Sequence, residues 1–171
     1  MNHRELISSE SRKLNHLHKE IGRHYLYRNK NPKPWKLACK DFHAYQSPID
    51  SYIDKIFGSV TEYDSELIEF SILFLELDPR FYRSGYIKEE ILRKFRKLEF
   101  SKKDNQRLRI VLLNAVERRA GREFKKYCSL YPQVKDEELE ATLINISKNE
   151  SSKGNRARLM LRYTTSGMNS M

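Results

Sequence analysis

Residues 67–77 read LIEFSILFLEL, a run in which eight of eleven side chains are apolar. On a helical wheel these side chains cover nearly the whole circumference, which is typical of a helix that other helices enclose. A buried strand is the alternative for so short a run. Asp64 and Ser65 precede it as candidate N-caps and its neighbours have helical patterns, so the run predicts a buried helix.

On both sides of this run, apolar residues recur at steps of three and four, the period of an amphipathic helix. The pattern predicts further helices over about residues 9–28, 35–45, 48–58, 87–98, 101–128 and 139–146. Local signals support several helix ends, namely Ser47 and Pro48 at a start, Gly58 at an end, and Ser101 with Asp104 as a capping box. With only 6 Gly and 5 Pro in 171 residues, long helices are favoured over many short strands.

These elements amount to about seven helices and no convincing strand. We therefore expect an all-α fold, an irregular helical bundle, in a single domain of residues 1–149. A short HEAT-like helical superhelix is the alternative, although no repeat of the roughly 40–47 residues typical of such units is visible. Residues 150–171 are polar and basic, and we expect them to form a flexible C-terminal tail.

The charge is strongly positive and unevenly distributed along the chain. The formal net charge is +10, with 33 basic and 23 acidic side chains. Residues 47–79 contain 1 basic and 8 acidic side chains, whereas residues 80–130 contain 16 basic and 6 acidic ones. A basic surface attracts polyanions such as nucleic acid, anionic membrane surfaces or acidic proteins. We expect the partner to be nucleic acid or an acidic protein.

The stretch NAVERRAGREFKKYC, residues 114–128, contains five cations. If the stretch is one helix, all five fall on or at the edge of one arc of about 100°, opposite the apolar side chains. They are Arg118, Arg119, Arg122, Lys125 and Lys126. A solvated face is the ordinary explanation of such a pattern. The arc contains no acid, however, and like charges four residues apart destabilise a helix by roughly a few tenths of a kcal/mol. We therefore favour an anion-binding face.

The helix expected before this stretch carries a second group of cations in its last turns, Arg93, Lys94, Arg96 and Lys97. Cations near a helix C-terminus also complement the helix dipole, which is the alternative explanation. If the two helices pack side by side, their cations form one surface for phosphates. The candidate nucleic-acid-binding residues are therefore Arg93, Arg96, Lys97, Arg118, Arg119, Arg122, Lys125 and Lys126.

Residues 76–86 read ELDPRFYRSGY and form an expected turn that interleaves arginine with aromatic residues. Such side chains can stack on exposed bases, at roughly 1–3 kcal/mol per base. More often, aromatic residues in a turn hold two helices together, and this alternative stays open. The candidate base-stacking loop comprises Arg80, Phe81, Tyr82, Arg83 and Tyr86.

The sequence contains none of the common motifs for catalysis, cofactors or metals. There is no Gly-x-Ser-x-Gly elbow, no Gly-rich phosphate loop and no His-Glu-x-x-His. His16, Glu20 and His24 share one helical face, but about 12 Å of helical rise separates the two histidines, too far for one metal ion. The acidic residues of 62–78 fit a helix surface as well as a catalytic pair. We therefore expect no metal site, no cofactor and no enzymatic activity.

Cys39 and Cys128 are far apart and form no Cys-x-x-Cys pair. Both fall at apolar positions of expected helices, which favours buried, reduced thiols in an intracellular protein. The first residues, MNHRELISSESRK, contain no apolar signal-peptide region, and no window approaches the about 18 uncharged apolar residues of a membrane span. The sequence thus predicts a cytoplasmic protein without a membrane span.

The first hypothesis for function is a non-enzymatic module that holds nucleic acid through phosphate contacts, without reading sequence. The alternative is an adaptor or self-assembling protein, in which acidic residues 47–79 of one chain complement basic residues 80–130 of another. The two blocks could equally complement each other within one chain. Whether the protein is a monomer or a homodimer is open at this point.

Overall fold

The computed structural model describes residues 2–58, 64–118 and 123–166. The residues in these ranges form nine helices and no strand, which confirms the all-α fold class. The helices are α1 (His3–Tyr25), α2 (Pro32–Ala44), α3 (Asp50–Phe57), α4 (Ser65–Leu77), α5 (Ser84–Phe95), α6 (Lys102–Glu117), α7 (Phe124–Val134), α8 (Glu137–Ser147) and α9 (Ser152–Ser166).

The chain divides into two compact units, unit 1 (Met1–Ile87) and unit 2 (Lys88–Met171), and each is described by itself. The helix count exceeds the expected seven for two reasons. Residues 101–128, expected as one helix, contain α6 and α7, and α9 occupies residues assigned to a tail. The prediction of a single domain over residues 1–149 stays a prediction.

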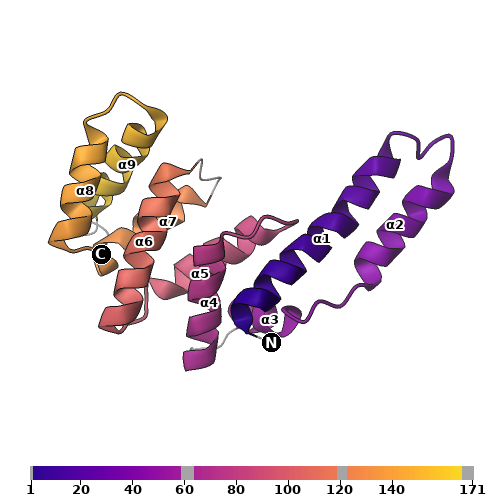
Figure 1. The fold of residues 1–171 in the computed structure, drawn as a ribbon, viewed down its shortest axis with the longest axis horizontal. Coiled ribbons are helices and arrows are strands. Elements are labelled where there is room, and N and C mark those ends of the chain that lie inside the picture. Colours follow the sequence, from indigo (N-terminus) through magenta and orange to yellow (C-terminus); the bar gives the residue numbers. More distant parts are fainter. Residues whose placement is uncertain (1, 59–63, 119–122, 167–171) are drawn as a thin grey trace. The chain divides into compact units, whose positions relative to one another are not determined.

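In unit 1, α1 and α2 form an antiparallel hairpin, and α4 packs against α1 and α3 (Figure 1). Helix α4 begins where the sequence indicated, because the Asp64 carboxylate accepts a hydrogen bond from the Leu67 N–H at 2.7 Å. Leu67 and residues 70–75 are buried, which confirms that neighbouring helices enclose α4. Asp78 ends the helix in the left-handed conformation, at φ 46°.

Aromatic rings fix the contacts around α4. The Phe70 ring stacks on the Tyr52 ring of α3 with centroids 4.2 Å apart, and the His3 imidazole meets Phe70 edge-on at 5.8 Å. The Tyr52 hydroxyl donates to Glu66 at 2.7 Å. These contacts join the first turn of α1, the middle of α3 and the buried side of α4 in one cluster.

A buried carboxylate connects α1 to the segment between α2 and α3. Glu10 is buried, and the hydroxyl groups of Tyr45 and Ser47 donate to its Oε2 atom at 2.8 and 2.6 Å. Burial, together with the hydrogen bond to Glu10, raises the pKa of Tyr45 to about 12. Because a buried carboxylate is unfavourable without donors, these two hydrogen bonds determine where the chain leaves α2.

Helix α3 begins two residues later than its sequence signal indicated. Ser47 and Pro48 were expected as N-cap and first helical residue, but the helix starts at Asp50. The Asp50 carboxylate accepts a hydrogen bond from the Ser47 N–H at 2.8 Å, which closes a turn before the helix. Gly58 ends the helix as expected, with its N–H bonded to the Asp54 carbonyl at 2.8 Å.

In unit 2, α7 packs against both α6 and α9, and α8 packs against α9 (Figure 1). Ser101 caps α6 as expected by accepting the Asp104 N–H at 3.1 Å, and its hydroxyl donates to the Asp104 carboxylate at 2.7 Å. Asp136 caps α8 in the same way. The core consists of apolar side chains from all four helices, including Leu108, Leu112, Val116, Cys128, Leu130, Tyr131, Leu139, Leu143, Ala157 and Met160.

Three arginines of unit 2 hydrogen-bond to the C-terminal carbonyl groups of three different helices. Arg156 donates to the Val116 carbonyl near the end of α6 at 2.7 Å, and Arg109 donates to the Val134 carbonyl of α7 at 2.6 Å. Arg158 donates to the Ser147 carbonyl of α8. The last carbonyl groups of a helix have no partner within the helix, so each guanidinium stabilises a helix end.

Helix α9 corrects the expectation for the C-terminus. Residues 150–171 were expected to form a flexible tail, yet Ser152–Ser166 are helical. Ala157 and Met160 are fully buried, and α9 supplies the two capping arginines of α6 and α8. The segment looks solvent-exposed from its polar composition, but two of its arginines hydrogen-bond to the ends of neighbouring helices.

Two glycine substitutions are expected to have opposite effects. Gly22 lies inside α1 with nothing within 4 Å of an added Cβ, so Gly22→Ala should stabilise unit 1 by about 0.5–1 kcal/mol. At Gly154 the Cβ would clash with the Asn149 backbone carbonyl, so Gly154→Ala should destabilise unit 2 by about 1–3 kcal/mol. Urea unfolding followed by fluorescence of Trp35, the one tryptophan, measures the stability of unit 1. The rate at which the buried Cys128 thiol reacts measures how often unit 2 opens, and so its stability.

Removal of the Tyr45 hydroxyl tests the Glu10 carboxylate. Tyr45→Phe should lower the free energy of unfolding of unit 1 by about 1–3 kcal/mol, because Glu10 loses one of two donors. Because the pKa of Tyr45 is raised above its usual 10.0, its contribution is complete below pH 10 and is lost as the pH approaches 12. Urea unfolding followed by Trp35 fluorescence at several pH values checks both the loss of unfolding free energy and its pH dependence. Tyr25→Phe is the matched control, and equal effects of the two substitutions would contradict the role of Glu10.

Candidate nucleic-acid interface

The helical wheel drawn over residues 114–128 is wrong, because this stretch is not one helix. Helix α6 ends at Glu117, and its C-cap Arg118 has extended backbone angles, φ −87° and ψ 157°. Arg119 and Arg122 lie outside the described residues. Gly121 was the available signal for a break, since glycine inside a helix is less favourable than alanine by about 1 kcal/mol.

The structure brings three of the predicted residues together in unit 2. Arg96, which follows α5, and Lys125 and Lys126 of α7 line an open cavity of about 450 Å³. Glu89, Ser129 and Tyr163 complete its lining. The lining therefore carries three cations and one carboxylate, a net charge of +2. These residues come from three elements that are separate in sequence, so their meeting depends on the packing of unit 2.

Lys125 and Lys126 lie in the first turn of α7, where a helix favours negative charge. The partial positive charge of the N-terminus makes each cation there unfavourable by typically about 0.3–1 kcal/mol. Helix α7 also has no side-chain cap, since Glu123 makes no capping hydrogen bond. Two lysines at an uncapped N-terminus form an arrangement that a bound anion would stabilise.

The polar groups of the cavity differ in what they can still bind. The side chains of Arg96 and Lys125 are exposed, and neither has a hydrogen-bond or ion-pair partner among the described residues. The Ser129 hydroxyl donates to the Lys126 carbonyl at 2.7 Å, so its hydrogen is already used. The Tyr163 hydroxyl has no partner within the described part of the chain and can donate to an anion.

Arg93 and Lys97, predicted for the same surface, have different surroundings. Arg93 donates to both carboxylate oxygens of Glu90, at 2.6 and 2.8 Å. This hydrogen-bonded pair lowers the pKa of Glu90 below its usual range. Lys97 is exposed, and its side chain has no partner in the described ranges. Burial lowers the pKa of the neighbouring Lys94. The Arg93 side chain is thus already paired with Glu90, whereas the exposed Lys97 side chain can contact a ligand.

The net charge belongs almost wholly to unit 2. Unit 2 contains 20 basic and 11 acidic side chains, net +9, whereas unit 1 contains 13 and 12, net +1. Several cations of unit 2 are used within it, as in the capping arginines and the ion pair between Arg109 and Asp136 at 2.8 Å. Arg96 and Lys125 have no such partner among the described residues, so they add to the net positive charge of unit 2.

The candidate base-stacking residues lie in unit 1, where they make contacts between helices. The Tyr82 ring stacks on His18 of α1 with centroids 5.1 Å apart, and Phe81 meets Phe74 edge-on at 6.1 Å. Arg83 has a φ of 71°, and its guanidinium lies 5.4 Å from the centre of the Tyr82 ring. Tyr86 and Tyr82 are each half exposed. The described contacts favour the packing interpretation for Phe81 and for one face of Tyr82.

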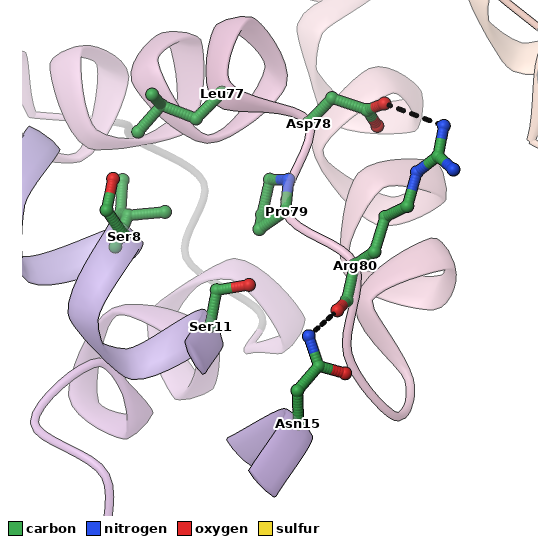
Figure 2. Close-up of a pocket in the computed structure, with 8 residues that line it drawn as sticks. Ser8, Ser11, Asn15, Leu77, Asp78, Pro79 and Arg80 are labelled. Carbon is green, nitrogen blue, oxygen red and sulfur yellow. Dashed lines mark hydrogen bonds and ion pairs between the residues drawn. The ribbon is translucent and has the colours of Figure 1, made fainter. Parts of the chain in front are cut away.

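A second, smaller cavity lies in unit 1, between α1 and the turn after α4 (Figure 2). It measures about 280 Å³, and the residues around it are Ile7, Ser8, Ser11, Asn15, Leu77, Asp78, Pro79 and Arg80. The Asn15 side chain donates to the Arg80 carbonyl, and the Arg80 guanidinium lies 3.8 Å from Asp78 (Figure 2). These bonds hold the turn in place, and they engage the most polar groups of the lining.

No group of three His, Cys, Asp or Glu side chains in the described ranges is placed to hold a metal ion. His24 lies 3.9 Å from Glu20, one turn apart on α1. No helix formed by the described residues is long and apolar enough to cross a membrane. Comparisons with protein-family models, curated proteins and solved structures found no match.

The two thiols should differ in reactivity. Cys128 is fully buried and burial raises the pKa of its thiol to about 12, whereas Cys39 is half-buried. At neutral pH an aromatic disulfide reagent should modify Cys39 first and reach Cys128 only when urea unfolds unit 2. Mass spectrometry of the adducts measures both rates. In the control Cys39→Ser, the native protein should take up no label, and rapid labelling of that variant would contradict the burial of Cys128.

Proposed function

We propose that unit 2 is a non-enzymatic nucleic-acid-binding module, and that the cavity of Arg96, Lys125 and Lys126 is a phosphate-binding site. The observation that supports this most directly is the position of the two lysines. They lie at the uncapped N-terminus of α7, next to Arg96, in a cavity with a net charge of +2. Like charges are held close together there without an internal partner for Arg96 or Lys125, and a phosphate group would neutralise them.

The proposed mechanism assigns each group a simple role. The planar Arg96 guanidinium presents paired N–H donors that fit two phosphate oxygens. Lys125 and Lys126 contribute point charges, and the Tyr163 hydroxyl contributes a neutral donor. None of these groups distinguishes one base from another, so binding would follow the backbone and not the sequence. The exposed Lys97 would extend the same contact along the strand.

The structure provides less support for self-assembly through the acidic residues 47–79. Several of these carboxylates already have partners within unit 1. Glu76 pairs with Arg4 of α1 at 3.1 Å, and Glu66 accepts a hydrogen bond from Tyr52. A carboxylate that leaves an existing partner gains little from a new one on another chain. The adaptor hypothesis therefore ranks second.

For the arrangement of the helices, we propose an irregular bundle and not a HEAT-like superhelix. The described helices range from 8 residues in α3 to 23 residues in α1. A superhelix requires repeats of similar length that stack in register. The unequal helices favour the irregular arrangement within each unit.

A triple substitution tests the proposed site. Arg96→Gln, Lys125→Gln and Lys126→Gln together should weaken binding to duplex DNA of every sequence. The slope of log K against log salt should fall in magnitude by up to about 2.7, since each phosphate contact contributes about 0.9. Fluorescence anisotropy over a salt series measures the slope. Because glutamine is a good helix former, the Cys128 thiol should stay protected.

The matched control removes the same charge elsewhere in unit 2. Lys102→Gln, Lys103→Gln and Lys148→Gln change three exposed lysines that have no side-chain partner among the described residues. This variant should retain most of the salt slope. If both triple variants lose the same slope, the charge acts diffusely and the cavity is not a site. If neither variant loses any, or if wild-type binding does not depend on salt, the nucleic-acid proposal fails.

A further inference from the structure

We propose that the tip of the α1–α2 hairpin in unit 1 docks on an anionic phospholipid bilayer, independently of the phosphate site of unit 2. The tip comprises residues 25–33, the last residue of α1, the connecting turn and the first residues of α2. Figure 1 shows this turn at the end of the hairpin opposite α3 and α4 of the same unit. It lies about 27 Å along α1 from Ile7, which lines a cavity together with Leu77 of α4.

The tip exposes large apolar side chains in succession. Leu26 is 82% exposed, Tyr27 65% and Tyr25 47%. Leu26 has the largest exposed fraction among the exposed large hydrophobic residues of the described ranges. Single exposed apolar residues are common, but three consecutive ones at the end of a projecting hairpin form a patch that needs an explanation.

The charge within the tip has one sign. Residues 21–40 contain six cations and no acidic residue, and one of the six, Arg23, pairs with Glu20 at 2.9 Å. Lys30 and Lys33 are exposed within the tip itself. Arg28 lies with its guanidinium 3.7 Å from the centre of the Tyr25 ring, so cation and aromatic ring share one surface. The combination of apolar tip and acid-free flanks is complementary to a surface that is apolar inside and anionic outside.

Backbone groups of the tip already form local hydrogen bonds. The N–H groups of Tyr27, Arg28, Lys30 and Asn31 each donate to a carbonyl of His24, Tyr25 or Tyr27, at 2.9–3.3 Å. The Arg28 guanidinium also donates to the Tyr25 carbonyl at 2.9 Å. Backbone groups that enter the hydrocarbon region of a bilayer need their hydrogen bonds satisfied internally. This turn meets that requirement at four consecutive or near-consecutive positions.

A bilayer explains these features together better than nucleic acid does. Phosphates would pair with the cations, but they offer nothing to an aliphatic side chain as exposed as Leu26. At a bilayer, leucine enters the acyl boundary, tyrosine lies at the headgroup level, and lysine stays outside with its stem along the surface. The leaflet that faces the cytoplasm is the anionic one in most membranes, which matches the sign of the flanks.

Co-sedimentation with lipid vesicles tests the proposal on the full chain. The protein should bind vesicles of an equimolar mixture of phosphatidylcholine and phosphatidylserine, and much less those of phosphatidylcholine alone. Leu26→Gln with Tyr27→Gln should weaken binding to the mixed vesicles by about tenfold or more. Lys30→Gln with Lys33→Gln should weaken it by roughly 30-fold, since each cation near the surface contributes about fivefold.

Two matched controls and one spectroscopic measurement locate the contact. Ile110→Gln with Ile144→Gln changes two exposed apolar residues of unit 2 and should leave vesicle binding unchanged. The triple Arg96, Lys125 and Lys126 variant should retain vesicle binding as well. Brominated phosphatidylserine should quench the fluorescence of Trp35, which lies in the first turn of α2, beside the tip.

The outcomes separate this proposal from the function proposed for unit 2. Vesicle binding that persists in the tip variants, or that occurs without quenching of Trp35, overturns the proposal. So does a tip variant that loses affinity for duplex DNA or RNA in solution while it still binds vesicles, because the tip is then a nucleic-acid surface. Loss of vesicle binding in the triple unit 2 variant alone would assign the lipid contact to the phosphate site instead.

Discussion

Helix α4 exposes little of its surface to water, and the arrangement of unit 1 follows from this constraint. Leu67 and residues 70–75 are buried, whereas Glu69 and Glu76 are only half-buried. Full burial of a leucine or phenylalanine side chain contributes roughly 1.5–3 kcal/mol, so an uncovered face would lose several kcal/mol. Helices α1 and α3 supply the cover. The polar contacts at the edges, such as Tyr52 with Glu66 and Arg4 with Glu76, then fix how they lie.

In unit 2 the comparable constraint is that the terminal N–H and C=O groups of each helix need hydrogen-bond partners from outside that helix. Arg109, Arg156 and Arg158 each satisfy carbonyl groups at the C-terminus of a different helix, and Ser101 and Asp136 cap two N-termini. The N-terminus of α7 differs, since it has no side-chain cap and carries two lysines. The exception is informative because it coincides with a cavity that holds a third cation.

The features that the sequence predicted are local ones. The N-caps at Asp64 and Ser101 depend on neighbours within one helix, and both are present. The apolar run of residues 67–77 also predicted the burial of Leu67 and residues 70–75. The end of α6 was missed because the wheel assumed a continuous helix over residues 114–128. Helix α9 was missed because the segment was read as a polar, basic tail, whereas the partners of Arg156 lie about forty residues earlier in the chain.

The candidate site shows the same limit more sharply. The sequence identified the cations of the site as candidates, but it did not predict which of them line one cavity. Arg96, Lys126 and Tyr163 belong to elements separated by 30 and 37 residues, and only tertiary packing places them around one cavity. Arg93 and Arg118, which were predicted for the same surface, are not among the residues that line the cavity. Arg93 forms an ion pair with Glu90, and Arg118 is the C-cap residue of α6. Charge composition therefore located the basic unit, and packing decided which of its cations face a common space.

The two basic surfaces of this protein are distinguished by what lies beside the cations. In the cavity of unit 2 the cations neighbour the Tyr163 hydroxyl group and a helix N-terminus, and both favour a compact anion with oxygen acceptors. At the tip of the α1–α2 hairpin they neighbour Leu26 and Tyr27, which would stay in water if the partner were an oxyanion alone. Coulombic attraction weakens with salt in both places, but burial of apolar surface does not. Contact at the tip should therefore retain a salt-resistant component that the cavity lacks, and this difference follows from the side chains adjacent to the charges rather than from the charges themselves.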